Sequence, residues 1–381
     1  LFQLTRSYKS LTVDTKLWYW TFYLGIMAFF GLILVTWNNP FLLNHATPPD
    51  GNGLNPLLQN PGMIFHPPLL FLGYGGFVIP GCLALAQTLS RKYAEETAWT
   101  DVARPFTLSA WAFLTAGIVL GGWWAYMELG WGGYWAWDPV ENASLIPWLI
   151  ATAALHTMLI QTRRNKLHGV NVFLMALTTV SAFFATYLVR SGVVQSVHAF
   201  EGDPVSLVMF GALIICSLLA GIVGLIVRRK SFGATDAADD DIESMMSKEA
   251  AYYVNNLIMI VFAVLLAYMT VSSALPSWLP FGGQSLSAGT YNAIARPLGI
   301  AYLAVLAICP LLGWRRTDKK AFWRSARVPA LCALVLFIVL MIYFATYLLP
   351  SYQAMIDMGG TQASGLLEQG NPIYYNGLAV V

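Results

Sequence analysis

Nine long apolar runs constrain the fold of this chain more than any other feature. A helix needs roughly 20 mainly apolar residues to cross about 30 Å of hydrocarbon, and each run is close to that length. Backbone groups in lipid must find their hydrogen-bond partners within the chain, so continuous runs of this length form helices. The runs cover residues 18–37, 69–88, 105–124, 145–162, 172–190, 205–227, 254–275, 297–314 and 329–349. The sequence therefore predicts an all-α, polytopic transmembrane helical bundle of about nine spans.

The composition excludes several classes of protein. Hydrophobic residues make up 57% of the chain and charged residues only 10%, whereas soluble domains carry about 25% charged residues. A soluble enzyme and a disordered chain are therefore excluded, and membrane lipid is the expected surrounding. A nucleic-acid partner is not expected either, because the net charge is only +2.

The lysines and arginines predict how the chain is oriented in the membrane. Of the 21 Lys and Arg residues, 19 fall in alternate connecting segments, which leaves only Arg190 and Arg296 on the other side. Basic loops stay in the cytoplasm, so the less basic segments are expected outside. The predicted outer segments are residues 38–68, 125–144, 191–204, 276–296 and 350–374.

One cytoplasmic segment predicts a division of the chain. Gly233 to Ala250 contains the acidic run Asp239–Asp241 and is typical of a flexible linker. We expect a first transmembrane half at residues 1–232, a linker at 233–250 and a C-terminal transmembrane part at 251–381. We also expect the C-terminal part to be truncated, because a tenth apolar run begins near Tyr374.

The second outer segment is rich in tryptophan. Five of the 14 tryptophans lie within 15 residues, interleaved with glycines. Tryptophan is common at membrane interfaces, but this density favours a flat aromatic floor for a large planar apolar ligand. Asp138 is placed as a helix N-cap, with Pro139 as the first helical residue and Glu141 as the capping partner.

Histidines on either side of this segment predict a metal site. His66 ends the first outer segment and His198 lies in the third, so both are expected on the same face as the tryptophans. Neutral imidazole is the commonest metal ligand, and two imidazoles can bind a haem iron axially. Arg190 could pair with a haem propionate through its forked guanidinium. His156 lies inside the fourth span, where an ionisable residue marks a functional candidate or bonds a neighbouring helix.

The stretch Trp131 to Ser144 closely resembles the tryptophan-rich WWD signature of haem-handling membrane proteins. Its extension through Pro147-Trp148-Leu149, with His156 beyond, is similar to the CcmF/NrfE-type cytochrome c haem lyases. The resemblance implies that His66 and His198 ligate an incoming substrate haem. We also expect Asp138 and Arg190 to contact this haem. The implied aromatic floor consists of Trp131, Trp135 and Trp137.

The resemblance also implies a resident b-type haem and a reaction. His156 matches one of two membrane histidines of that haem, but no histidine follows His198 in this sequence, so either the chain stops before the second one or the resident haem lacks that ligand. The implied activity joins haem to the Cys-x-x-Cys-His segment of apocytochrome c at the outer face of the bacterial cytoplasmic (inner) membrane. Implied partners are a haem chaperone, other cytochrome c maturation subunits and quinol. The alternatives are a haem exporter or haem-delivery membrane protein, and a non-haem secondary transporter.

Overall fold

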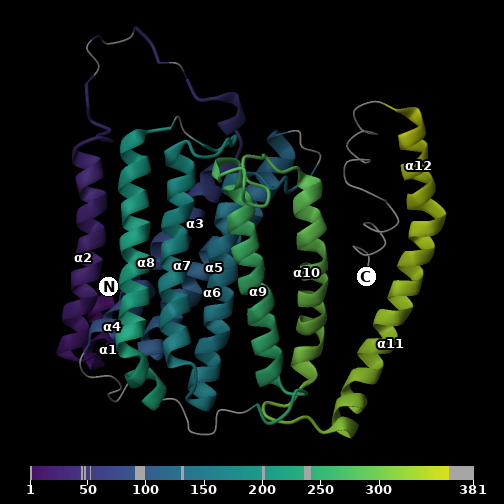
Figure 1. Ribbon diagram of the computed structural model, residues 1–381. Helices are drawn as coiled ribbons and strands as arrows, with labels where there is room; N and C mark the ends of the chain where they lie inside the picture. Colours follow the sequence, from purple (N-terminus) through teal and green to yellow (C-terminus); the bar gives the residue numbers. More distant parts are fainter. Residues whose placement is uncertain are drawn as a thin grey trace. The chain divides into compact units, whose positions relative to one another are not determined.

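The computed structural model describes residues 2–43, 46, 49–51, 53–90, 99–129, 133–199, 202–235 and 242–359. Within these residues the chain is helical and contains no strand. The described part holds nine helical segments that are long and apolar enough to cross a membrane. The predicted all-α bundle of about nine spans is therefore confirmed (Figure 1).

The nine spans overlap the predicted apolar runs, but all except the span of α8 begin four to ten residues earlier, which places His66 inside α3 instead of in the first outer segment. Their bounds are α1 Arg6–Ser10, α2 Val13–Val35, α3 Gly62–Gly76, α4 Val78–Leu89, α5 Trp99–Glu128, α6 Pro139–Arg164, α7 His168–Ser191, α8 Pro204–Thr235, α9 Lys248–Thr270, α10 Ala288–Ile308, α11 Lys319–Tyr343 and α12 Leu349–Met358. Helices α3 and α4 together form one span, interrupted at Phe77. A π-helical turn, Phe344–Leu348, joins α11 to α12.

The chain divides into two compact units. The first comprises Leu1–Asp240 and Met259–Gln284, and the second comprises Asp241–Ile258 and Ser285–Val381. The domain limits at residues 232 and 250 stay a prediction. The predicted site residues all belong to the first unit, in which α2 to α8 run side by side (Figure 1).

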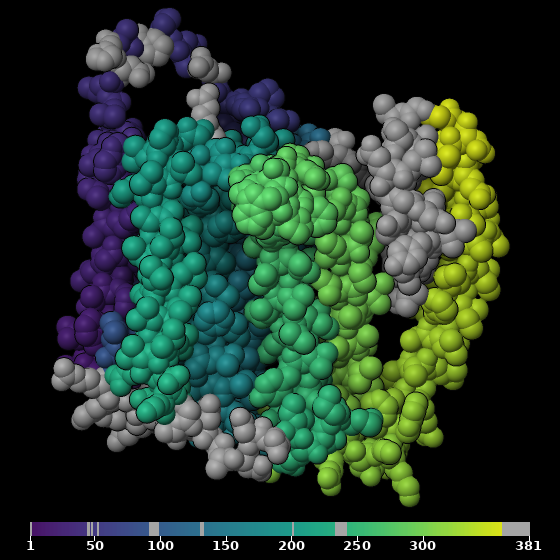
Figure 2. All heavy atoms as spheres, viewed as in Figure 1, coloured from purple at the N-terminus to yellow at the C-terminus, as the bar shows by residue number. Residues whose placement is uncertain are grey.

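The outward faces of the first unit are apolar, as lipid contact requires. Along α8, the side chains of Val208, Ile215, Leu219, Val223 and Ile226 are all more than half exposed. Helix α8 is the teal helix at the surface of the view in Figure 2. Large exposed apolar surfaces of this kind are rare on soluble proteins but suit a hydrocarbon surrounding.

Helices α3 and α5 approach each other closely along their length, because glycine or alanine occupies one side of each contact. A Cβ added to Gly73 would lie 2.7 Å from the Leu114 Cβ, and one added to Gly117 would lie 2.8 Å from the Leu70 nitrogen. This close packing brings His66 on α3 directly against α5.

Helices α5 and α6 are held in register by a pair of tryptophans. The indole N–H of Trp111 donates to the Thr152 hydroxyl at 2.9 Å, and that of Trp148 donates to the Thr115 hydroxyl at 2.8 Å. The two rings stack with centroids 5.7 Å apart. Satisfying both indole donors inside the membrane stabilises this antiparallel pairing, which sets the first turn of α6 beside the last turns of α5.

Candidate functional site

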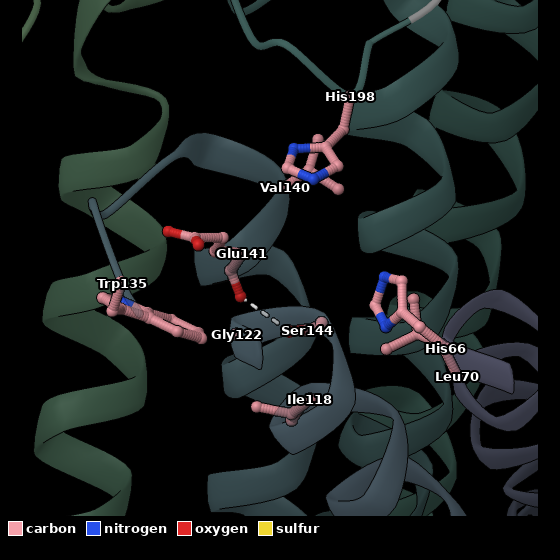
Figure 3. A pocket seen from close by; sticks show the side chains of 10 residues that line it. His66, Leu70, Ile118, Gly122, Trp135, Val140, Glu141, Ser144 and His198 are labelled. Atoms are coloured by element: carbon pink, nitrogen blue, oxygen red, sulfur yellow. Dashed lines mark hydrogen bonds between the residues drawn. The ribbon is translucent and has the colours of Figure 1, made fainter. Parts of the chain in front are cut away.

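A small cavity lies where the ends of α3, α5 and α6 meet. Helices α3 and α5 and the first turns of α6 supply most of its wall, and the connecting segments α5–α6 and α7–α8 supply the rest (Figure 3). Its lining residues are His66, Leu70, Ile118, Gly121, Gly122, Trp135, Val140, Glu141, Ser144 and His198. The volume is about 40 Å³, enough for a few water molecules. The cavity therefore brings together residues from the three segments that the sequence placed on one face.

His66 is held against α5 by a backbone carbonyl. Its Nδ1 lies 2.7 Å from the Gly117 oxygen. A carbonyl oxygen only accepts, so Nδ1 carries the hydrogen and the lone pair is on Nε2. Gly121 makes room for the ring, since an added Cβ there would lie 2.5 Å from the His66 Cε1. The position and tautomer of His66 are therefore both fixed by α5.

His198 is held by a carboxylate. Its Nδ1 lies 3.1 Å from Asp138 Oδ2, and the Ser196 hydroxyl donates to the same oxygen at 2.6 Å. Burial raises the pKa of Asp138, but hydrogen bonds from His198 and Ser196 outweigh that effect and hold the pKa below its ordinary value. The carboxylate is therefore ionised at neutral pH, so Nδ1 donates to it and the lone pair of His198 is on Nε2.

Asp138 is also the N-cap of α6, as the sequence predicted. Its side chain accepts from the Val140 N–H at 3.1 Å, and the Glu141 carboxylate accepts from the Asp138 N–H at 3.0 Å. The same Glu141 oxygen accepts from the Ala136 N–H at 3.1 Å. The predicted capping box is confirmed. It also ties the aromatic segment to the first turn of α6.

The predicted aromatic floor is only partly found at the cavity. Trp135 lines it, and its Nε1 is buried without a hydrogen-bond partner in the described structure. Trp137 has φ of +60° and packs at an edge on Trp135 and Phe262, away from the lining. Trp131 lies outside the described residues.

A different tryptophan contacts His198. Trp124 is buried near the end of α5, and its ring centroid lies 5.6 Å from that of His198 with an interplanar angle of 61°. Its indole N–H donates to the Leu57 carbonyl at 3.1 Å. Sequence reasoning did not assign Trp124 to the floor, although it stands one helical turn beyond Gly121 and so shares a face with it. Glu141 was likewise given a capping role only.

Two predicted residues lie away from the cavity. His156 is half-buried on α6, on the same stripe as Trp148 and Thr152, and about 18 Å along the helix axis from Ser144. Arg190 is near the end of α7, where its carbonyl accepts from the Asp203 N–H at 3.2 Å. Arg190 is not among the residues that line the cavity.

A sequence model described as "Cytochrome C assembly protein" matches residues 3–195, which is more than half of the chain. The chain belongs to the cytochrome c assembly protein family. The matched region contains His66, the tryptophan-rich segment and His156, and it ends three residues before His198. The resemblance found in the sequence is therefore confirmed at the level of the family.

Members of this family with longer chains are similar to most of the sequence. "Cytochrome c-type biogenesis protein CycK" of Bradyrhizobium diazoefficiens is 42% identical over 291 residues, 76% of this chain and 43% of that protein. "Probable cytochrome c-type biogenesis protein NrfE" of Escherichia coli is 36% identical over 297 residues, 78% of this chain and 52% of that protein. A solved structure, "Cytochrome c Heme Lyase CcmF", matches with a TM-score of 0.65 and 29% identity over 89% of this chain and 48% of that one. This chain spans about half the length of these relatives.

Proposed function

We propose that this family member takes part in covalent attachment of haem to apocytochrome c, with the cavity between His66 and His198 as the substrate-haem site. The observation that carries the proposal is the pair of imidazoles on one cavity, each with Nδ1 donating to an acceptor. That tautomer presents Nε2 as the ligating nitrogen, and histidine is a common axial ligand of haem iron. The cytochrome c assembly family and a haem lyase among the relatives support it.

Other lining residues fit a haem. Leu70, Ile118 and Val140 provide apolar wall for the macrocycle. The buried indole N–H of Trp135 suits a carboxylate such as a haem propionate, because an unpaired buried donor is costly until it finds an acceptor. The volume of about 40 Å³ is well below the roughly 300–1,000 Å³ of ordinary ligand pockets, so the cavity must enlarge when haem enters.

The reaction needs orientation more than acid or base strength. A thiol of the Cys-x-x-Cys-His segment adds across a haem vinyl group: a carbon–sulfur bond forms, and the thiol hydrogen ends on the other vinyl carbon. No oxidant or reductant is consumed in this addition. Both thiols come from the substrate, since none of the four cysteines of this chain lines the cavity. Fixing the macrocycle between two imidazoles supplies the proximity on which such additions depend.

A titration with haem tests the site directly. Ferric haem added to the purified protein in detergent should give a six-coordinate, low-spin spectrum, because two imidazoles occupy the axial positions. A five-coordinate, high-spin spectrum, or no saturable binding, would contradict the paired-ligand site.

Haem delivery or export is the alternative use of the same cavity. Attachment and delivery are distinguished by their products. Attachment yields a cytochrome that keeps its haem stain after denaturation, whereas delivery leaves haem that is extracted by acid and organic solvent. We expect the stain to persist when this chain acts together with the other cytochrome c maturation subunits, a haem chaperone and apocytochrome c.

His156 is proposed to bind a resident b-type haem. Among the described residues no second histidine lies at that depth: His66 and His168 stand near the ends of α3 and α7, and His198 lies between α7 and α8. His156 is therefore the histidine of the described residues that would hold such a haem. When bound, such a haem supplies single electrons, drawn from quinol, that keep the substrate haem iron ferrous.

The resident haem leads to a prediction for His156→Ala. We expect the purified variant to lose most of the b-type Soret absorption, because the one imidazole inside α6 is removed. The measurement is the reduced-minus-oxidised spectrum per mole of protein. An unchanged spectrum and potential would mean that His156 is a packing residue.

The cavity is proposed to face outward from the bacterial cytoplasmic membrane. A cysteine placed in the first outer segment can report this orientation. Asn52 of that segment lies outside the described residues, whereas Leu54 is described and 59% exposed. In a background without the four native cysteines, Leu54→Cys should react with a membrane-impermeant maleimide in intact cells. Labelling only after the membrane is permeabilised would reverse the orientation.

A further inference from the structure

The two imidazoles of the cavity are held by acceptors of different charge. His66 donates to the neutral carbonyl of Gly117, whereas His198 donates to the ionised carboxylate of Asp138. A carboxylate on the far nitrogen of an imidazole raises the basicity of the nitrogen that binds the metal. If both bind one iron, the bond from His198 is expected to be the stronger.

The attachment of His198 is also more extensive. Its ring donates to Asp138, its backbone N–H donates to the Ser196 hydroxyl at 3.0 Å, and that hydroxyl donates back to Asp138. Asp138 is in turn fixed by the Val140 N–H as the cap of α6. His198 therefore lies in a connecting segment but is anchored to the start of a buried helix. Trp124 packs on its ring.

The turn that carries His66 is held by fewer bonds. Pro67 and Pro68 follow it inside α3, so two backbone donors that would bond the preceding turn are missing. The ring itself is held by the carbonyl of Gly117 and by contact with Gly121. Moving this ring away from an iron breaks one neutral hydrogen bond, whereas moving His198 disrupts a charged network.

We propose that Asp138 is a positioning residue that makes His198 the retained axial ligand of the substrate haem. His66 is then the ligand displaced by the histidine of the incoming Cys-x-x-Cys-His segment. This assignment rests on the proposed function and extends it, because it distinguishes two ligands that the haem site alone leaves equivalent.

The first experiment compares His66→Gly with His198→Gly. The affinity of each purified variant for added ferric haem is measured by titration, with added imidazole to fill the vacated ligand position in a parallel series. We expect His198→Gly to lose about tenfold more affinity than His66→Gly, in line with the cost of removing such supported ligation. Equal losses, or a larger loss in His66→Gly, would overturn the assignment.

The second experiment removes the negative charge of Asp138 but keeps a residue that can cap α6. Asp138→Asn retains a good N-cap residue and an acceptor oxygen, so the start of α6 is preserved. The matched control is Asp203→Asn, because Asp203 ends the segment that carries His198 and caps α8 by accepting from Val205 and Ser206. The melting temperature of each variant without haem checks that the helices remain intact.

We expect Asp138→Asn to weaken ferric relative to ferrous haem binding about tenfold, which raises the one-electron reduction potential by about 59 mV. Asp203→Asn should leave that potential at the value of the parent protein. Equal shifts in both variants would refute the role of Asp138. If His66→Gly and His198→Gly both bind haem like the parent protein, the proposed haem site itself fails, and this result is distinct from equal losses in the two variants.

Discussion

Replacing both His66 and His198 by alanine should abolish cytochrome c maturation and leave the His156-dependent haem in place. The double variant removes both imidazoles from the cavity but leaves the α5–α6 pairing through Trp111 and Trp148 untouched. Loss of orientation at a reacting centre costs about 10²-fold or more, so covalent product should fall below about one hundredth of the normal yield. The measurement is haem-stained c-type cytochrome in cells that depend on this chain.

His168→Asn is the control for this experiment. His168 begins α7 at the end opposite the cavity, so its replacement tests a buried histidine without touching the proposed haem site. We expect the control to mature cytochrome c and the double variant to keep its reduced b-type spectrum. Maturation above about one tenth of the normal yield in the double variant would mean that the cavity is not where the substrate haem binds.

The sequence predicted the spans well because their cause is local. An apolar run of roughly 20 residues in lipid has one stable backbone arrangement, so counting runs was sufficient. The start of α6 was equally predictable, since the cap at Asp138 and the Glu141 partner lie within four residues of each other. His66 and His198 could be placed on one face because an even number of predicted spans lies between them along the chain.

The rest of the site depends on contacts between distant segments, which no local pattern encodes. Asp138 and His198 are 60 residues apart, and their hydrogen bond exists only after α6 and α7 have packed. The direction of the Trp137 side chain follows from its positive φ. Sequence alone does not predict this left-handed backbone conformation for a tryptophan. Arg190 was expected at a propionate; the structure places it near the end of α7, outside the residues that line the cavity, and its role stays a prediction.

Gly121→Ala should damage the cavity with a single methyl group. An added Cβ at this position would lie 2.5 Å from the His66 Cε1 and 2.7 Å from its Nδ1, so the ring must move. That movement breaks the bond from His66 to the Gly117 carbonyl, at a cost of about 0.5–1.5 kcal/mol. Overpacking between α3 and α5 adds about 1–3 kcal/mol. We therefore expect a lower melting temperature and weaker haem binding.

Gly75→Ala is the matched control, because it makes the same change in a helix of the same pair. Nothing lies within 4 Å of a Cβ added at Gly75, so the methyl group meets no obstacle. Alanine should stabilise α3 there by about 0.5–1 kcal/mol, since glycine loses more backbone freedom on folding. The two variants are thus expected to shift the melting temperature in opposite directions. Only Gly121→Ala should weaken haem binding, and equal binding by the two would show that the position of the His66 ring does not control the site.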